Sequence, residues 1–206
     1  GDIVRTKDFT WNMMINASHI KNEITKLPQE EIISGTKKYM VGRSMYDFWL
    51  RKWEGVDPQT GDALYSKDIK DAEGNVTGSE IVNDYTIADY YYVGTSIPDL
   101  YGSIQNLLTW KGFELSVLTT YQIGGQVYDS VYGSLMSHSG YGSAMHIDIL
   151  KRWQKPGDVT EVPRIDTTKN PNQNAGSSRW LTSASYFSFK NITLAYSFPR
   201  KWAEKL

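Results

Sequence analysis

Residues 102–123 read GSIQNLLTWKGFELSVLTTYQI, and this stretch decides the fold. Apolar and polar residues alternate on both sides of a central Lys111-Gly112. This period of two indicates two strands, each with one apolar and one polar face. A two-residue connection with glycine, where a positive φ is needed, predicts a tight β-hairpin. On the second strand we expect Phe113, Leu115, Val117 and Tyr121 to face one side and Ser116, Thr120 and Gln122 the other.

The same alternation occurs near both ends of the chain, beginning at Phe9 and running through Ile192 to Phe198. The pattern therefore predicts strands near 9–20, 102–110, 113–123 and 186–198, with a tight turn at Arg5–Asp8 before the first. The segments 21–99 and 124–185 are rich in Gly, Asp, Asn, Tyr and Pro. They are predicted to be long loops, which in compact domains are usually functional. No further strand of the sheet is expected between 21 and 99.

Composition excludes several classes of protein. The 206 residues have a net charge of −1 and no cysteine. Without a basic surface, nucleic acid is not an expected partner, and disulfides and thiolate metal sites are ruled out. No apolar run approaches the ~20 residues of a membrane-spanning helix.

Two folds are compatible with alternating strands, a soluble β-sandwich and an outer-membrane β-barrel. The predicted strands have about the ten residues that a tilted strand needs to cross hydrocarbon. Their apolar faces carry no charge, and short turns alternate with long loops. These features favour an all-β fold, an antiparallel transmembrane β-barrel segment with long extracellular loops. The soluble β-sandwich remains the alternative.

The sequence contains no recognisable catalytic or cofactor motif. Its three histidines lack metal-ligand spacing, and phosphate-binding and hydrolase motifs are missing. We therefore expect no enzyme activity, no cofactor and no metal site. The stretch Ile69–Glu80 partly matches an EF-hand calcium loop, but Ile69 replaces the leading aspartate. A solvated turn is the favoured interpretation.

Large aromatic residues are frequent in the predicted loops. Trp and Tyr rings beside polar groups suit the apolar faces and hydroxyl rims of sugars. The same rings could instead pack the loops, since long ordered loops need small cores of their own. The candidate ligand or partner contacts are Trp49, Trp53, Tyr65, Tyr91, Tyr132, Trp153 and Trp180.

Five pieces of the sequence, in order, resemble the C-terminal barrel portion of the SusC/RagA family of TonB-linked (TonB-dependent) outer-membrane receptors of Bacteroidetes. They begin with DFTWNMMINASHIKNEITKL and GVDPQTGDALY. The third is YVGTSIPDLYGSIQNLLTWKGFELSVLTTYQIGGQVYD. RWQKPGD and SRWLTSASYFSFKNITLAYSFP follow.

The resemblance implies that residues 1–206 are one part of an outer-membrane barrel of about 22 strands. The plug domain would precede Gly1, and the final strands would follow Leu206. Such receptors import oligosaccharides, or peptides in the RagA type, with a SusD-like surface lipoprotein as partner. TonB would act through an N-terminal region outside this chain, and membrane lipid would surround the strands. A soluble surface carbohydrate-binding module is the competing expectation.

Overall fold

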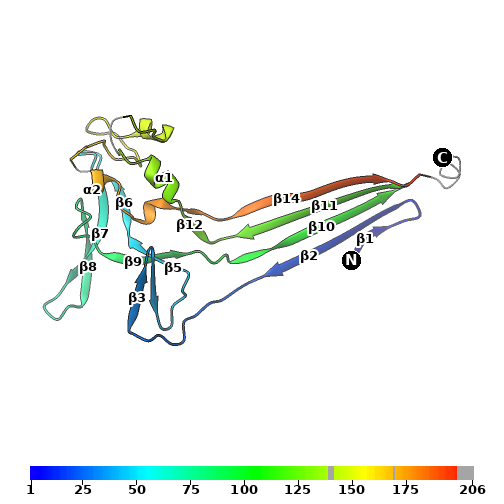
Figure 1. The fold of residues 1–206 in the computed structure, drawn as a ribbon, viewed down its shortest axis with the longest axis horizontal. Helices are drawn as coiled ribbons and strands as arrows, with labels where there is room; N and C mark the ends of the chain where they lie inside the picture. The colour runs from blue at the N-terminus through cyan, green and yellow to red at the C-terminus, as the bar shows by residue number, and fades with distance from the viewer. Residues whose placement is uncertain (139–141, 169, 199–206) are drawn as a thin grey trace. The chain divides into compact units, whose positions relative to one another are not determined.

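The computed structural model describes residues 1–138, 142–168 and 170–198 (Figure 1). The chain divides into two compact units. The first, here called the sheet unit, comprises residues 1–21, 97–126 and 183–198. The second, here called the loop unit, comprises residues 22–96 and 127–182. Within the described ranges, no helix is both long enough and apolar enough to span a bilayer.

The sheet unit is one five-stranded antiparallel sheet with the order β1-β2-β10-β11-β14. Its strands are β1 (Asp2–Arg5), β2 (Phe9–Ser18), β10 (Leu100–Trp110), β11 (Phe113–Ile123) and β14 (Tyr186–Tyr196). β2 pairs directly with β10, so this sheet takes no strand from the chain between them. Lys111 and Gly112 both have positive φ, 43° and 89°, as a two-residue hairpin turn requires.

The strand register gathers the apolar side chains on one face of this sheet. Leu115 lies opposite Leu194 on one side and Leu108 on the other, and Leu108 lies opposite Trp11. Much of the face is uncovered: the exposed fractions are 70 % for Leu194, 62 % for Ile192 and 58 % for Ile15. Within the described residues, no second sheet covers these three side chains. The all-β antiparallel barrel fold is confirmed, and the barrel is not closed in this chain.

The opposite face of the sheet unit is polar, and its side chains bond across strands. Asn16 Nδ2 donates to Ser103 Oγ at 2.6 Å, and the Ser103 backbone N–H donates back to Asn16 Oδ1 at 3.0 Å. The hydroxyls of Thr10 and Thr109 are hydrogen-bonded to each other. In a transmembrane barrel such a face lines the water-filled interior.

Gly102 gives a close approach on the apolar face. It lies opposite Tyr121, whose hydroxyl donates to the backbone carbonyl of Asn16 at 3.0 Å. A Cβ at position 102 would lie 2.0 Å from the Asn16 oxygen and 2.8 Å from the Tyr121 hydroxyl. Glycine is therefore required for the tyrosine to reach across β10 to β2.

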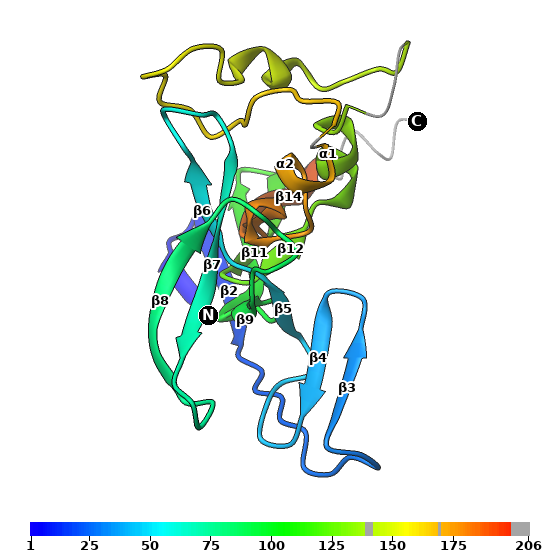
Figure 2. The same ribbon diagram turned by 90° about the vertical axis from the view of Figure 1, so that its left-hand side faces the viewer.

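The loop unit contains two further antiparallel sheets (Figures 1 and 2). One has the order β3-β4-β5-β9, with β3 (Glu31–Ser34), β4 (Lys37–Met40), β5 (Asp47–Arg51) and β9 (Tyr90–Thr95). The other has the order β6-β7-β8, with β6 (Trp53–Val56), β7 (Ala63–Lys70) and β8 (Val76–Val82). The segment 21–99, expected to be a loop, thus contains seven short strands. Each of them has only four to eight residues, too few to give a clear periodic pattern.

The segment 124–185 also has local structure. Its elements are β12 (Gln126–Tyr128), α1 (Ser130–Leu135), the 3-10 helix η1 (Ile147–Lys151), α2 (Asn170–Gln173), the 3-10 helix η2 (Ser178–Trp180) and β13 (Leu181–Ser183). One small core of the loop unit joins Ala63, Tyr65, Ala88 and Ala175, and a second joins Met136, Val162 and Trp180. Both long segments therefore contribute to one packed unit.

Candidate functional site

One face of the β3-β4-β5-β9 sheet carries a cluster of aromatic rings. Trp49 lies opposite Tyr92, and Arg51 lies opposite Tyr90. Because strand residues two apart share a face, these four side chains lie together, whereas Phe48 and Leu50 on the other face are buried. The ring centroids of Trp49 are 4.8 Å from Tyr92 and 6.2 Å from Tyr90.

One cationic side chain lies over each of these rings. The Arg43 guanidinium is 4.5 Å from the ring centre of Tyr92, and the Arg51 guanidinium is 4.4 Å from that of Tyr90. Arg51 also lies 5.0 Å from the ring of Tyr85. Such contacts attract the cation to the ring face. We call this set the cation–ring row: Arg43, Tyr92, Trp49, Tyr90, Arg51 and Tyr85.

The charges around the cation–ring row are unevenly paired. Lys38 lies 4.4 Å from the ring centre of Trp49 and forms an ion pair with Glu31 at 2.5 Å. Arg51 is held by neutral groups, since its Nε donates to the Tyr85 carbonyl at 2.7 Å and its Nη1 to the Tyr90 hydroxyl at 2.6 Å. Within the described ranges, neither Arg43 nor Arg51 forms an ion pair with a carboxylate.

A second cluster of rings lies inside the loop unit, around the guanidinium of Arg179. The Arg179 guanidinium lies between two indoles, 4.4 Å from Trp180 and 4.9 Å from Trp53. The fully buried Tyr65 donates its hydroxyl to the Asn172 carbonyl at 2.5 Å. Burial raises the pKa of Tyr65 to about 12 and lowers the pKa of Arg179 to about 10. At neutral pH the tyrosine is therefore neutral and the arginine charged.

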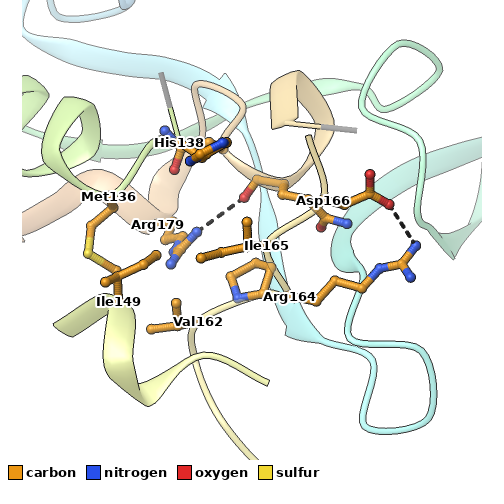
Figure 3. Close-up of a pocket in the computed structure, with 11 residues that line it drawn as sticks. Met136, His138, Ile149, Val162, Arg164, Ile165, Asp166 and Arg179 are labelled. Atoms are coloured by element: carbon orange, nitrogen blue, oxygen red, sulfur yellow. Dashed lines mark hydrogen bonds and ion pairs between the residues drawn. The ribbon is translucent and has the colours of Figure 1, made fainter. Parts of the chain in front are cut away.

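A cavity lies beside Arg179 (Figure 3). Met136, Ile149 and Val162 form an apolar part of its wall, and Arg164 pairs with Asp166 at 3.3 Å on another side. Its volume is about 20 Å³, which is about the space of one water molecule. A sugar ring or a dipeptide would not fit, so this cavity is not a nutrient site.

Asp62 anchors a network that holds the two segments of the loop unit together. Its buried carboxylate accepts hydrogen bonds from Arg164 Nε at 3.0 Å and Gln173 Nε2 at 2.8 Å. Gln173 Oε1 in turn accepts the backbone N–H of Ala63 at 2.7 Å. A buried carboxylate without such partners would be strongly destabilising, so the network is structural.

The stretch Ile69–Glu80 forms part of the β7-β8 hairpin. Asp71 Oδ1 accepts the backbone N–H groups of Glu73 at 3.1 Å and Asn75 at 2.8 Å. Its Oδ2 accepts Asn75 Nδ2 at 3.1 Å. The carboxylate thus serves the turn, as the favoured interpretation predicted. Nowhere in residues 1–138, 142–168 and 170–198 do three or more His, Cys, Asp or Glu residues group to hold a metal.

Comparison with known proteins identifies the relatives of this chain. No protein-family model matches it. TonB-dependent receptor P39 of Formosa agariphila is 26 % identical over 246 residues, which cover 98 % of this chain and 23 % of the relative. TonB-dependent receptor P3 of the same organism is 23 % identical over 224 residues, covering 98 % and 21 %. The chain is a homologue of the TonB-dependent receptors.

TonB-dependent receptors are outer-membrane β-barrel proteins, so the predicted location in the outer membrane is confirmed. The chain spans less than a quarter of the curated receptors that it matches. Its fold is shared with a structure of the RagAB peptide transporter, with a TM-score of 0.79, 22 % identity and coverage of 98 % of this chain and 22 % of that one. A closed-closed state of the RagAB peptide importer gives a TM-score of 0.81 at 21 % identity, with the same coverage.

The seven predicted contact residues of this TonB-dependent receptor homologue have different surroundings. Tyr65 and Trp180 are 0 % and 2 % exposed, so their rings pack inside the loop unit. Trp53 packs edge-on against Tyr65. These three rings pack against other residues of the loop unit, which was the alternative expectation for every aromatic residue of the predicted loops.

The remaining candidates keep some exposure, and most are held by hydrogen bonds. Tyr91 donates its hydroxyl to Asp68 at 2.7 Å, and Tyr132 donates to Asp148 at 3.0 Å. Trp153 donates its indole N–H to the Pro58 carbonyl at 2.9 Å. Trp49 alone of the seven belongs to the cation–ring row.

The two arginines of the row were not among the contact candidates. The signal available in the sequence was the spacing of Tyr90 and Tyr92, which places two rings on one strand face. The cross-strand partners Trp49 and Arg51 follow only from the register of β5 with β9.

Proposed function

We propose that this chain is part of a TonB-dependent nutrient importer of the SusC type that takes up oligosaccharides across the outer membrane. The observation that carries the proposal is the sheet unit, with an uncovered apolar face for lipid and a hydrogen-bonded polar face for the barrel interior. Curated homologues named TonB-dependent receptors support it over nearly the whole chain. Because these relatives are receptors, we propose no enzyme activity.

The loop unit would lie on the extracellular side. It joins strands whose other ends meet at the tight Lys111-Gly112 turn, the kind of short connection that outer-membrane barrels place in the periplasm. We propose a SusD-like surface lipoprotein as the partner of these loops, which the RagAB assembly of the structural neighbours supports. TonB would supply energy through a part of the receptor outside residues 1–206.

Uptake by the intact receptor tests the proposal. Cells lacking the receptor gene, and the same cells complemented with it, should be compared for growth and uptake on oligosaccharides and on peptides as sole nutrient. We expect the deletion to abolish uptake of at least one oligosaccharide, complementation to restore it, and loss of TonB to abolish it again. Unchanged uptake of every oligosaccharide in the deletion strain would contradict the proposal.

A peptide is the second candidate substrate. It is favoured by the structural neighbours, which are described as a peptide transporter and a peptide importer. The same uptake experiment separates the two, because deletion would then impair growth on peptides and leave growth on oligosaccharides unchanged. Affinity purification of the intact receptor from native membranes would test the partner, and recovery without any lipoprotein would count against it.

A further inference from the structure

The arginines of the cation–ring row differ from three lysines of the loop unit in the groups that they contact. Lys52, Lys67 and Lys151 each lie 2.6–2.8 Å from a carboxylate of a neighbouring glutamate or aspartate. Arg43 and Arg51 instead lie on tyrosine rings, and the described part of the chain gives them no ion pair. A guanidinium on a ring face keeps N–H groups at its edge available for an anion.

The geometry of the row suits an extended ligand. Arg43 contacts Tyr92, Tyr92 contacts Trp49, Trp49 contacts Tyr90 and Tyr90 contacts Arg51, with ring-to-ring and cation-to-ring distances of 4.4–6.2 Å. The two guanidiniums therefore lie at separate points of a line of rings. Arg51 is also preorganised, because the Tyr85 carbonyl and the Tyr90 hydroxyl fix its orientation.

The position of the row in the sheet indicates how a ligand would be recognised. Trp49 and Arg51 belong to β5, which pairs with β4 on one side and β9 on the other. A peptide could not add to the sheet along this interior strand, although the edge strand β9, which carries Tyr90 and Tyr92, is open to strand addition. Recognition at β5 must come from side chains, and flat rings suit the apolar faces of sugar rings.

We propose that the cation–ring row binds an anionic oligosaccharide, with Arg43 and Arg51 pairing with its acidic groups and Trp49 and Tyr90 stacking on its sugar rings. This inference rests on the proposed function and specifies its substrate: a saccharide that carries carboxylate or sulfate groups. On this face Lys38 is paired with Glu31 and Asp47 adds one negative charge, whereas Arg43 and Arg51 form no ion pair with a carboxylate in the described residues.

Binding by the purified intact receptor in detergent tests the inference without requiring energised import. The acidic probes are short oligogalacturonides, hyaluronan fragments and chondroitin sulfate fragments. Fully methyl-esterified oligogalacturonide is the neutral match, since it keeps the sugar backbone and loses the charge. Polyglutamate is the acidic peptide match. Calorimetry or a fluorescence titration gives the Kd for each.

We expect at least one acidic saccharide to bind, and the double variant Arg43→Gln, Arg51→Gln to raise its Kd at least tenfold. Trp49→Ala should also weaken binding. Arg152→Gln is the matched control, because it removes an arginine charge from the same unit but outside the row. Added salt should weaken binding by the native receptor, because screening reduces the attraction between charges. Unchanged thermal unfolding of the double variant would show that it is folded.

Several results would overturn the inference. They are no binding of any acidic saccharide, equal binding of the methyl ester, no effect of the double variant, or binding of polyglutamate in place of the saccharides. The proposed function fails separately, through unchanged uptake in the deletion strain. A receptor that imports neutral oligosaccharides and shows no charge preference would refute this inference alone.

Discussion

The indole of Trp153 lies directly on Gly61. A Cβ on Gly61, whose φ is +74°, would lie 2.4 Å from Trp153 Cδ2, and Trp153 Nε1 donates to the Pro58 carbonyl at 2.9 Å. Trp153 belongs to the piece RWQKPGD (152–158) and Gly61 to the piece GVDPQTGDALY (55–65). The structure brings these two pieces into contact. Two constraints therefore favour glycine at position 61, its backbone conformation and the space taken by the ring.

Substituting Gly61→Ala should destabilise the loop unit. The positive φ costs ~1–2 kcal/mol for a residue with a side chain, and the overlap with Trp153 adds about 1–3 kcal/mol of overpacking. Gly74→Ala is the matched control, because Gly74 has a φ of +87° but no atom within 4 Å of its Cβ position. Hydrogen exchange of the intact receptor should show a larger loss of protection around Gly61 than around Gly74. Equal losses would contradict a steric role for Trp153.

Substituting Gly102→Ala should disturb the sheet unit. The added Cβ would lie 2.0 Å from the Asn16 backbone oxygen. Because a backbone atom cannot rotate away as a side chain can, this clash is relieved only if β2 shifts against β10. We expect a loss of ~1–3 kcal/mol, as for other overpacked sites, seen as a lower unfolding temperature of the intact barrel. In Gly78→Ala the new Cβ would meet only Ile69 Cδ1, at 3.8 Å, and little change is expected. A Gly102→Ala receptor as stable as the native one would show that β2 and β10 separate at this point without a measurable cost.

A charge on the apolar face should be costly. Val117 lies near the middle of β11, opposite Asn106 on one side and Ile192 on the other. If this face contacts lipid, Val117→Lys should destabilise the folded barrel by ~2–4 kcal/mol. Gln105→Lys, on the polar face of β10, should be nearly neutral. Equilibrium refolding of the intact receptor into lipid vesicles measures both, and similar values for the two variants would argue against lipid contact.

The stability of the loop unit should depend on pH through Lys37. Its ammonium group lies 3.3 Å from the ring centre of Phe48 and donates to the Tyr46 carbonyl, and burial lowers its pKa from 10.5 to about 8. A lysine whose pKa is lower in the folded state binds fewer protons there than in the unfolded state. Its contribution to stability therefore increases as the pH rises from about 8 toward 10.5.

Tyr65 has the opposite effect at higher pH. Burial raises its pKa from 10.0 to about 12, so stability decreases above pH 10, where the unfolded tyrosine loses its proton and the folded one retains it. We expect Lys37→Met to remove the increase between about pH 8 and 10 and to leave the decrease above pH 10. Hydrogen-exchange protection within β4 and β5, corrected for the intrinsic exchange rate at each pH, checks this. A Lys37→Met receptor that keeps the full increase would assign it to another group.

The sheet unit could be predicted from the sequence because its strands are long. Ten or eleven alternating residues in β2, β10, β11 and β14 give a clear period of two, and Lys111-Gly112 fixes the hairpin. In the loop unit, β5 has five residues and contains Asp47 and Arg51, so its pattern is too short and too charged to read. The cation–ring row depends on the pairing of β5 with β9, about 40 positions away in the chain. Local sequence does not encode such a register.

The two chain segments of the loop unit, residues 22–96 and 127–182, depend on each other through hydrogen bonds. Asp62 and Arg164 are 102 positions apart, and Ala63 and Gln173 are 110 apart, yet both pairs are hydrogen-bonded. A chimaera that exchanged residues 22–96 with those of a related receptor, and kept residues 127–182, would break the hydrogen bonds of Arg164 and Gln173 to Asp62 unless the donor supplied a carboxylate at position 62. Recombination between receptor genes would then preserve these segments as a co-adapted pair, and loop grafts intended to change specificity should transfer both.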